Sequence, residues 1–507
     1  MQTTLDSPSP IAGAVEEVRN GENSTSRRKI TTTIFSFPVM CFTLLAAAVF
    51  RWCVKDIAEH DIWWHLLNAK YFFQNHALPR VEMYSFTAAG SPWLDHEWLS
   101  EILFYVGYHP FGLRGLLAVY FVILLLIFAG VYYRATRAAG NCKDAIVVTA
   151  FGVMLSVVSI GPRLLLFGWL CMVGLLLVLD HFRRSGKGLW LLPPLFCLWI
   201  NLHGSWVYGI VVLGLTIASG LVTGEWAHVI ARRWSRAELK KLLITLGASL
   251  AALFVNPFSY RLLLYPFDLL FRQQSNLKHI EEWQSIDFNT GNGKLAMVLL
   301  LGLLAALWFS RRRWRLDEVL LSAFALWSAL SHVRLLFFAG LILMPILAPC
   351  LTLFPRYERE EDKPWLNAAI IAAALGWLIF FYPSQVKLQR TVANKLPVAA
   401  VAFMQQQHIT GRIFNSHGWG GYMEWSAPKL KPYVDGRTDI FVYNGVFDDY
   451  GKIVTLEDTF EILDRYKIDY VLYEPDSPLS YLLDHSKGWR RIYADHLAVV
   501  FERVPVP

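Results

Sequence analysis

The chain alternates long apolar stretches with short polar connections between about residue 33 and residue 382. Eleven apolar segments stand out, several of them shorter than the ~20 residues of an ideal transmembrane helix. They cover residues 33–54, 113–133, 145–160, 164–179, 189–202, 206–222, 242–255, 295–309, 319–330, 335–353 and 365–382. We therefore expect a mainly α-helical, polytopic transmembrane bundle of about eleven spans over residues 31–383, with tilted or broken helices among the shorter segments.

Two regions lie outside this pattern. Residues 1–30 are polar and rich in Ser and Thr, which predicts a disordered cytoplasmic tail. After residue 383 the long apolar runs stop, and short strand-like runs alternate with helical stretches. Strands are expected at 412–414, 470–473 and 497–501, and helices near 456–465 and 479–485. This alternation predicts a small soluble α/β domain over residues 384–507.

The basic residues give the bundle an orientation. They cluster between the apolar segments at 27–29, 134–143, 183–187, 232–241 and 311–315. All five clusters fall on one side when the eleven spans are threaded alternately, and the positive-inside rule identifies that side as the cytoplasm. The loop 55–112 and the C-terminal domain are then extracytoplasmic, with the N-terminus inside and the C-terminus outside.

Composition supports a membrane protein and excludes other classes. Hydrophobic residues make up 55% of the chain and charged residues only 17%, far from the balance of a water-soluble domain. The formal net charge of +7 lies in short clusters between apolar runs, which argues against nucleic acid as a partner. The six cysteines show no spacing typical of a zinc site, so buried structural thiols are expected.

The outer loop 55–112 carries the first group of candidate catalytic residues. Glu59 and Asp61 stand two residues apart after the first span, and Ile62–His65 then begins an interfacial helix rich in Trp. A carboxylate near the N-terminus of such a helix can act as a general base, and an acidic pair can hold a divalent cation such as Mg²⁺ or Mn²⁺. Plain solvated polarity after a helix end is the alternative, and the pattern leaves both open.

A second group follows in the same loop. Asp95, His96 and Glu97 precede Trp98, and His65 ends the first motif. These residues are candidates for substrate binding in a cavity. An N-capped amphipathic helix lying on the membrane is the alternative, and it is compatible with Glu97 facing a cavity.

Cationic residues at the outer ends of the spans form a third group. Arg163, His203 and Arg334 are candidates for binding a phosphate, because the arginine fork suits phosphate oxygens. Structural ion pairs with Glu281, Glu282 or Asp287 are the alternative for each arginine. In the C-terminal domain, Gly418–Tyr422 is expected to be a tight turn, with sugar stacking by Trp419 or Tyr422 as the less favoured option.

Six motifs fall on the predicted outer face: Asp61–His65, Tyr84–Thr87, Pro92–Trp93, His96–Leu99, Asn201–Gly204 and Asp435–Arg437. Together they resemble bacterial polytopic membrane proteins related to the GT-C glycosyltransferases. The resemblance implies a multi-span core, a catalytic acid in the first outer loop, and a polyprenyl-phosphate-linked sugar donor. It assigns Asp61 as the base and Glu59 as its acidic companion. Many relatives have Asp-Pro-Asp where this chain has Glu59-His60-Asp61, so two carboxylates are kept while the metal-binding pattern differs.

Two functions of different class follow. The first is an inverting membrane glycosyltransferase of the bacterial cytoplasmic (inner) membrane, which transfers the sugar to a glycan, lipid or protein acceptor on the extracytoplasmic side. The alternative is a non-enzymatic carrier or envelope-assembly component that binds a lipid-linked glycan and passes it on. Replacement of Asp61 by Asn discriminates the two, because a carrier should tolerate it.

Overall fold

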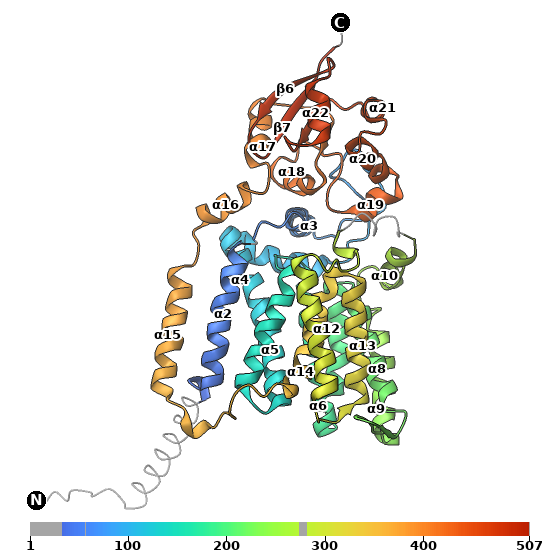
Figure 1. Cartoon of the computed structure of the whole chain (residues 1–507). Helices are drawn as coiled ribbons and strands as arrows, with labels where there is room; N and C mark the ends of the chain where they lie inside the picture. Colours follow the sequence, from blue (N-terminus) through green and yellow to red (C-terminus); the bar gives the residue numbers. More distant parts are fainter. Residues whose placement is uncertain (1–32, 56, 273–280, 506–507) are drawn as a thin grey trace, which may run out of the picture.

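The computed structural model describes residues 33–55, 57–272 and 281–505. A bundle of helices carries a smaller α/β domain on one end, and helix α3 (Ile62–Asn75) lies across that end of the bundle, below the domain (Figure 1). The first described helix of the bundle starts at the end opposite to this domain (Figure 1).

Each of the eleven predicted apolar segments corresponds to a helix. These helices are α2 (Phe37–Lys55), α4 (Trp98–Ala139), α5 (Cys142–Leu155), α6 (Leu165–Ser185), α7 (Leu192–Leu202), α8 (Trp206–Ser219), α9 (Arg236–Ala252), α12 (Gly291–Phe309), α13 (Leu316–Ser331), α14 (Leu336–Leu347) and α15 (Pro364–Phe380). The fold is therefore mainly helical, as the hydrophobic pattern predicts. Not all of these helices are long enough to cross a membrane.

Six helices in the described part of the chain are long and apolar enough to cross a membrane by themselves. They are α2, α4, α6 and α12, together with α5 and α14 when their flanking 3₁₀ turns are included. A seventh is obtained if α15 and α16 (Gln385–Ala393), which are bent by 66° at a short break, form one span. Helices α7, α8, α9 and α13 have only 11 to 17 residues. That each of these four crosses the membrane, as a count of eleven spans requires, stays a prediction.

Helix α4 joins the outer loop to the second predicted span and bends where the two meet. Gly112 breaks the helix with φ 58° and ψ −142°, two residues after Pro110. The bend brings Gly107 against Gly115, where a β-carbon would lie 1.9 Å from the Gly107 carbonyl oxygen. Only glycine permits this approach. The segment after residue 97, expected within the outer loop with an amphipathic helix as the alternative, is therefore helical and joins the spanning part of α4 at the Gly112 kink.

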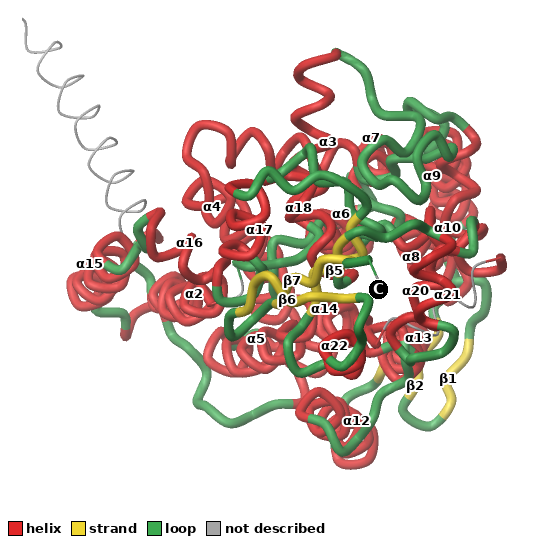
Figure 2. Tube along the Cα trace, turned by 90° about the horizontal axis from the view of Figure 1, so that it is seen from above, coloured by secondary structure: helices red, strands yellow, loops and turns green. Residues whose placement is uncertain are grey.

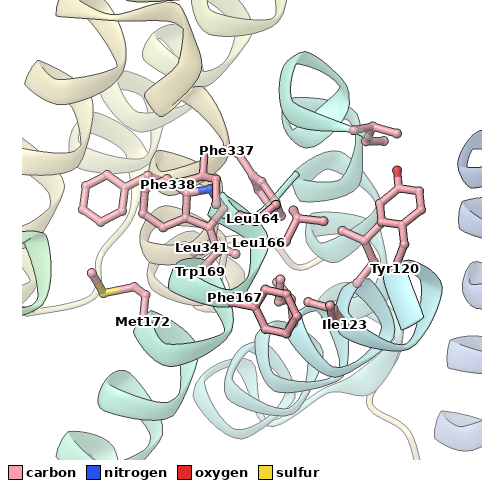
Figure 3. Close-up of a cluster of buried hydrophobic side chains, with 14 of the residues drawn as sticks. Tyr120, Ile123, Leu164, Leu166, Phe167, Trp169, Met172, Phe337, Phe338 and Leu341 are labelled. Carbon is pink, nitrogen blue, oxygen red and sulfur yellow. The ribbon is translucent and has the colours of Figure 1, made fainter. Parts of the chain in front are cut away.

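The bundle packs around α14, whose side chains are buried almost throughout. Figure 3 shows Phe337 and Phe338 of α14 beside Trp169 of α6, and the rings of Trp169 and Phe338 stack with centroids 5.5 Å apart. Tyr120 of α4 lies on the other side of this cluster (Figure 3). A helix that is apolar all round suits a protein core or a lipid environment, and the burial of its side chains shows that α14 lies in the core of the bundle.

The C-terminal domain contains a four-stranded sheet in the order β4-β5-β7-β6. Its strands are β4 (Ile413–Asn415), β5 (Tyr470–Tyr473), β6 (Trp489–Ala494) and β7 (Val499–Arg503), with β4 parallel to β5 and the other pairs antiparallel. The helices are α17 (Val398–Gln406), α18 (Gly420–Ser426), α19 (Thr438–Tyr443), α20 (Val446–Val454), α21 (Thr459–Arg465) and α22 (Pro478–Asp484). Figure 2 shows the sheet above the middle of the bundle. The α/β prediction is confirmed, although strand β6 was not predicted.

The remaining elements lie at the two ends of the bundle. At the end away from the C-terminal domain, β1 (Gly224–Trp226), β2 (Val229–Ala231) and β3 (Trp314–Arg315) form a small sheet. At the end near the domain, α10 (Tyr260–Arg272) contacts α19, because the Tyr265 hydroxyl donates a 3.1 Å hydrogen bond to Asp439.

Candidate functional site

Helix α3 has two faces of different chemistry. Asp61 is its N-cap residue, and Asp61, His65 and Asn68 follow one another at helical spacing. His65 and Asn68 both contact Glu101 of α4. The opposite face carries Trp63 and Lys70, which contact α18 instead. The helix thus separates a polar region from an aromatic one.

The Asp61 carboxylate is held against the C-terminal domain at Gly436. A β-carbon at Gly436 would lie 1.8 Å from Asp61 Oδ1 and 3.2 Å from Trp64 Nε1, so any larger residue would have to displace the Asp61 carboxylate. Burial raises the pKa of Asp61 to about 7, and the neighbouring charge of Glu59 adds to the rise. A carboxylate with a pKa near the ambient pH is suited to accept a proton and release it again.

Glu59 pairs with Arg163. Arg163 Nε lies 3.1 Å from Glu59 Oε2, and its Nη1 bonds Glu282 at the end of the loop before α12. One arginine therefore bridges two carboxylates, which is the structural alternative that the sequence left open for this residue. A phosphate-binding role for Arg163 stays a prediction, as does a catalytic role for Glu59, whose carboxylate is paired with Arg163.

Three imidazoles surround Glu97. His203 Nε2 lies 3.0 Å from Glu97 Oε1, and the Nε2 atoms of His65 and His96 each lie 3.9 Å from Oε2. The amide of Ser205 donates to His203 Nδ1 at 2.9 Å, so the proton of a neutral His203 resides on Nε2 and points to Glu97. The structure thus brings together four residues predicted from three separate places in the sequence.

Burial controls the charge of this histidine cluster. It raises the pKa of Glu97 to about 8, against the opposing charge of Arg334, and lowers the pKa of His96 to about 4. It also lowers the pKa values of His65 and His203. The cluster is therefore close to neutral at pH 7, because burial disfavours every charged form.

Asp95 and Arg334 complete the set of predicted residues. Asp95 is fully buried, with no hydrogen-bond partner for Oδ2 within the described residues, and burial raises its pKa to about 7. The Arg334 guanidinium lies over the ring of Trp283, 4.7 Å from its centroid. Among the residues that the structure describes, no carboxylate oxygen lies within 4 Å of Arg334. Arg334 is thus the predicted arginine that remains open to an anionic ligand.

A buried ion cluster that the sequence did not indicate ties the first outer loop to the C-terminal domain. Arg437 Nη1 bonds Glu82 Oε2 at 2.6 Å, Nη2 bonds Glu424 Oε1 at 3.2 Å, and Nε bonds Asp435 Oδ1 at 2.8 Å. Glu82, Glu424 and Asp435 also have the mutual spacing of a metal site. The Arg437 guanidinium already bonds all three, so it occupies the place that a cation would take.

The distance along the sequence between these residues explains why the sequence does not predict the cluster. Asp435–Arg437 was noted only as a motif, and Glu82 and Glu424 gave no signal at all. Hydrogen bonds join Arg437 to a residue 355 positions earlier, which no local pattern records. The apolar contacts agree with the ion cluster, because Trp64, Ala88 and Trp93 belong to the same buried group as the core of the C-terminal domain.

No family model matches the sequence, and a sequence search among characterised proteins finds no match. The structure is similar to the Archaeoglobus fulgidus oligosaccharyltransferase tethered to an acceptor peptide with the NVT sequon, at a TM-score of 0.53 and 12% identity, over 93% of this chain and 75% of that chain. It is also similar to the archaeal oligosaccharyltransferase AglB from the same organism in complex with an inhibitory peptide and a dolichol-phosphate, at 0.53 and 11%, over 92% and 74%.

A third similar structure is ArnT from Cupriavidus metallidurans bound to undecaprenyl phosphate, with a TM-score of 0.45 and 14% identity over 91% of this chain and 97% of that chain. The likeness to the two archaeal structures shows the fold: a polytopic, GT-C-like helical bundle with a C-terminal α/β domain. The expected resemblance in fold is confirmed. The roles of individual residues rest on the geometry described above.

Proposed function

We propose that this GT-C-like protein is an inverting membrane glycosyltransferase. It takes a sugar from a polyprenyl-phosphate-linked donor and transfers it to an acceptor on the extracytoplasmic side of the bacterial cytoplasmic membrane. The observation that carries the proposal is the enclosed carboxylate of Asp61 at the start of α3, with its pKa near 7. The fold likeness to oligosaccharyltransferases supports lipid-linked glycosyl transfer as the general class of reaction.

Asp61 is the general base in this mechanism. Its carboxylate takes the proton of an acceptor hydroxyl while the hydroxyl oxygen forms a bond to the anomeric carbon of the donor sugar. The bond from that carbon to the phosphate oxygen breaks on the opposite face, which inverts the configuration. The electron pair stays on the lipid phosphate, which leaves with one more negative charge.

Arg334 is suited to receive this charge. Its guanidinium is held over Trp283 and lies close enough to Glu97 to influence the Glu97 pKa. His203 lies at the same cluster through its contact with Glu97. A fixed cation where charge develops stabilises the transition state without reorganisation. Arg163 holds Glu59 in place, and we assign it a positioning role rather than contact with phosphate.

The sequence offers Mg²⁺ or Mn²⁺ as an option for the acidic pair Glu59 and Asp61. In the structure Glu59 is paired with Arg163, and the Glu97 carboxyl contacts His203. Among the described residues, the carboxylates with the mutual spacing of a metal site are Glu82, Glu424 and Asp435, which bond Arg437. These residues do not fit a divalent ion at Asp61, and no step of the mechanism uses one.

The test is transfer of a labelled sugar from a polyprenyl-phosphate donor by purified protein in liposomes. Asp61→Asn removes the proton acceptor with little change in size, and general-base loss lowers rates by about a hundredfold to ten-thousandfold. Asp287→Asn, an exposed carboxylate at the same end of the bundle, is the matched control and should keep its activity. Asp61→Asn protein with unaltered turnover would exclude the base assignment, and a wild-type protein that binds the donor without transferring the sugar would favour the non-enzymatic carrier.

A further inference from the structure

A cavity of about 450 Å³ lies against the aromatic face of α3, the face turned away from Asp61's polar partners. Trp63, Tyr108, Tyr422 and Trp425 contribute aromatic walls. The cavity is bounded by α3, the bend of α4, α16, α17 and α18. Its volume is within the range of about 300–1,000 Å³ that is typical of small-molecule sites.

The aromatic walls hold one another in place. The rings of Trp63 and Tyr422 meet edge to face at 5.2 Å, and those of Tyr108 and Trp425 at 5.5 Å. Trp63 and Trp425 lie 6.4 Å apart, and Lys70 Nζ lies 5.5 Å from the centroid of the Trp425 ring. Edge-to-face contacts of this kind fix ring orientation. The cavity is therefore shaped before a ligand arrives.

The opposite wall comes from α16 and is mixed. Gln385, Gln389 and Arg390 line the cavity there beside Val386, Val392 and Ala393, and Ser426 adds a hydroxyl from α18. Gln385 is fixed by the backbone, since its Oε1 accepts from the Arg114 amide at 3.3 Å. Among the residues that the structure describes, no acidic side chain lines the cavity.

This combination of walls indicates the class of ligand. Aromatic faces stack on the C–H faces of sugar rings, and amide and hydroxyl groups hydrogen-bond sugar hydroxyls. An acyl chain would make no hydrogen bond to Gln389, Arg390 or Ser426, and an interfacial aromatic belt faces lipid and encloses no volume. A carbohydrate satisfies both walls at once.

We propose that this cavity binds a carbohydrate, and that it holds the glycan of the acceptor. The second half of the proposal rests on the proposed function. Trp63 is two residues from Asp61, the N-cap of α3, and faces the other way, so a glycan bound against Trp63 reaches the proposed base around the N-terminal end of α3. The donor phosphate would then lie on the side of Arg334 and the histidine cluster. The acceptor hydroxyl and the donor sugar would meet at Asp61.

Binding is tested without any donor, by saturation-transfer difference NMR on the full-length protein in phosphatidylcholine nanodiscs prepared without sugar detergents. The probes are N,N′-diacetylchitobiose and maltose. The wild-type protein should transfer saturation to the ring protons of at least one of them. Trp425→Ala should weaken this binding about tenfold, as expected for the loss of ~1.4 kcal/mol of stacking, and Trp425→Phe should largely restore it.

Ala393→Phe fills the cavity without removing a contact and should also abolish the signal, since Ala393 lines its wall. Trp308→Ala removes a ring that is 83% exposed on α12 and should leave binding unchanged. Equal signals from wild-type protein and Ala393→Phe, or none with either probe, would overturn the proposal. So would a phospholipid that native mass spectrometry finds in the wild-type protein and not in Ala393→Phe.

The Asp61→Asn variant separates the two proposals. It should bind the probe like the wild-type protein while losing transfer activity. Sugar binding with normal transfer by Asp61→Asn would refute the proposed base and leave the cavity assignment standing. Normal transfer by Ala393→Phe would refute the acceptor assignment alone.

Discussion

Removal of Arg437 should loosen the C-terminal domain from the membrane bundle. Arg437 is 2% exposed and bonds Glu82 of the first outer loop as well as Glu424 and Asp435 of its own domain. Arg437→Met fills the same volume without charge and leaves three buried carboxyl groups without their cation. Burial and the neighbouring Asp435 raise the pKa of Glu424, so that group keeps its proton, while the guanidinium lowers the pKa of Asp435.

The expected loss in the free energy of unfolding follows from this charge balance. Breaking a buried ion pair by removing one partner costs about 3–5 kcal/mol, because a charge stays buried without compensation. Arg490→Met is the matched control, since Arg490 pairs with Glu502 at 2.6 Å on the surface of the same domain. An exposed pair contributes about 0–1 kcal/mol. We therefore expect a clear separation between two variants that each remove one arginine.

Thermal unfolding of the full-length protein in nanodiscs, combined with limited trypsin digestion, measures the difference. Arg437→Met should melt at lower temperature and release the C-terminal domain to trypsin, while Arg490→Met should match the wild-type protein. Adding Glu82→Gln to Arg437→Met should recover part of the loss. Equal melting of the Arg437→Met and Arg490→Met proteins would refute the reasoning.

The pH dependence of Arg437→Met has a defined sign. Without the guanidinium, burial raises the folded-state pKa of the remaining ionised carboxyl groups above the value in the unfolded chain. Such groups favour folding when protonated, so their penalty appears as pH rises above about 4, the ordinary carboxyl range. The stability gap between variant and wild-type protein should therefore narrow as pH falls from 7 towards 4. A gap that widens on acidification would contradict the assigned charges.

Three further predictions concern the site and the topology. Because the pKa of Asp61 is raised to about 7 and the base must be deprotonated, the wild-type rate at low substrate should fall about tenfold per pH unit below 7, measured as kcat/KM of sugar transfer; a flat profile down to pH 5 would exclude Asp61. Gly436→Ala should lower kcat by about tenfold or more without loss of fold, because its β-carbon displaces the Asp61 carboxylate, and Gly451→Ala, in open space, is the control. Compartment-specific reporters fused after residues 187 and 507 should report cytoplasmic and extracytoplasmic positions respectively; a cytoplasmic signal at residue 507 would refute the threading of the chain.

The hydrophobic pattern determined the bundle because membrane helices are local objects. A run of apolar residues must satisfy its own backbone hydrogen bonds in lipid, so its length and composition specify a helix without reference to distant residues. All eleven segments are helices for this reason. The pattern was less informative for α4, because the outer part of this helix is amphipathic and a loop residue such as Gly112, where the helix kinks, leaves its junction with the span open. Strand β6 was missed because Arg490 and Arg491 interrupt its apolar character at an edge of the sheet.

The sequence by itself also identified Asp61, Glu97 and the histidines, since ionisable groups beside membrane spans are unusual enough to be noticed singly. Only the tertiary structure decided which of these residues contact one another. It placed His65, His96 and His203 around one carboxylate, gave Arg163 two partners, and left Arg334 available. The sequence indicated single members of the Arg437 cluster and of the aromatic cavity, such as the Asp435–Arg437 motif and Tyr422, but not their assembly, because each joins residues more than 300 positions apart. Charge and burial act through space, and the order of residues along a chain does not record which side chains will share a buried site.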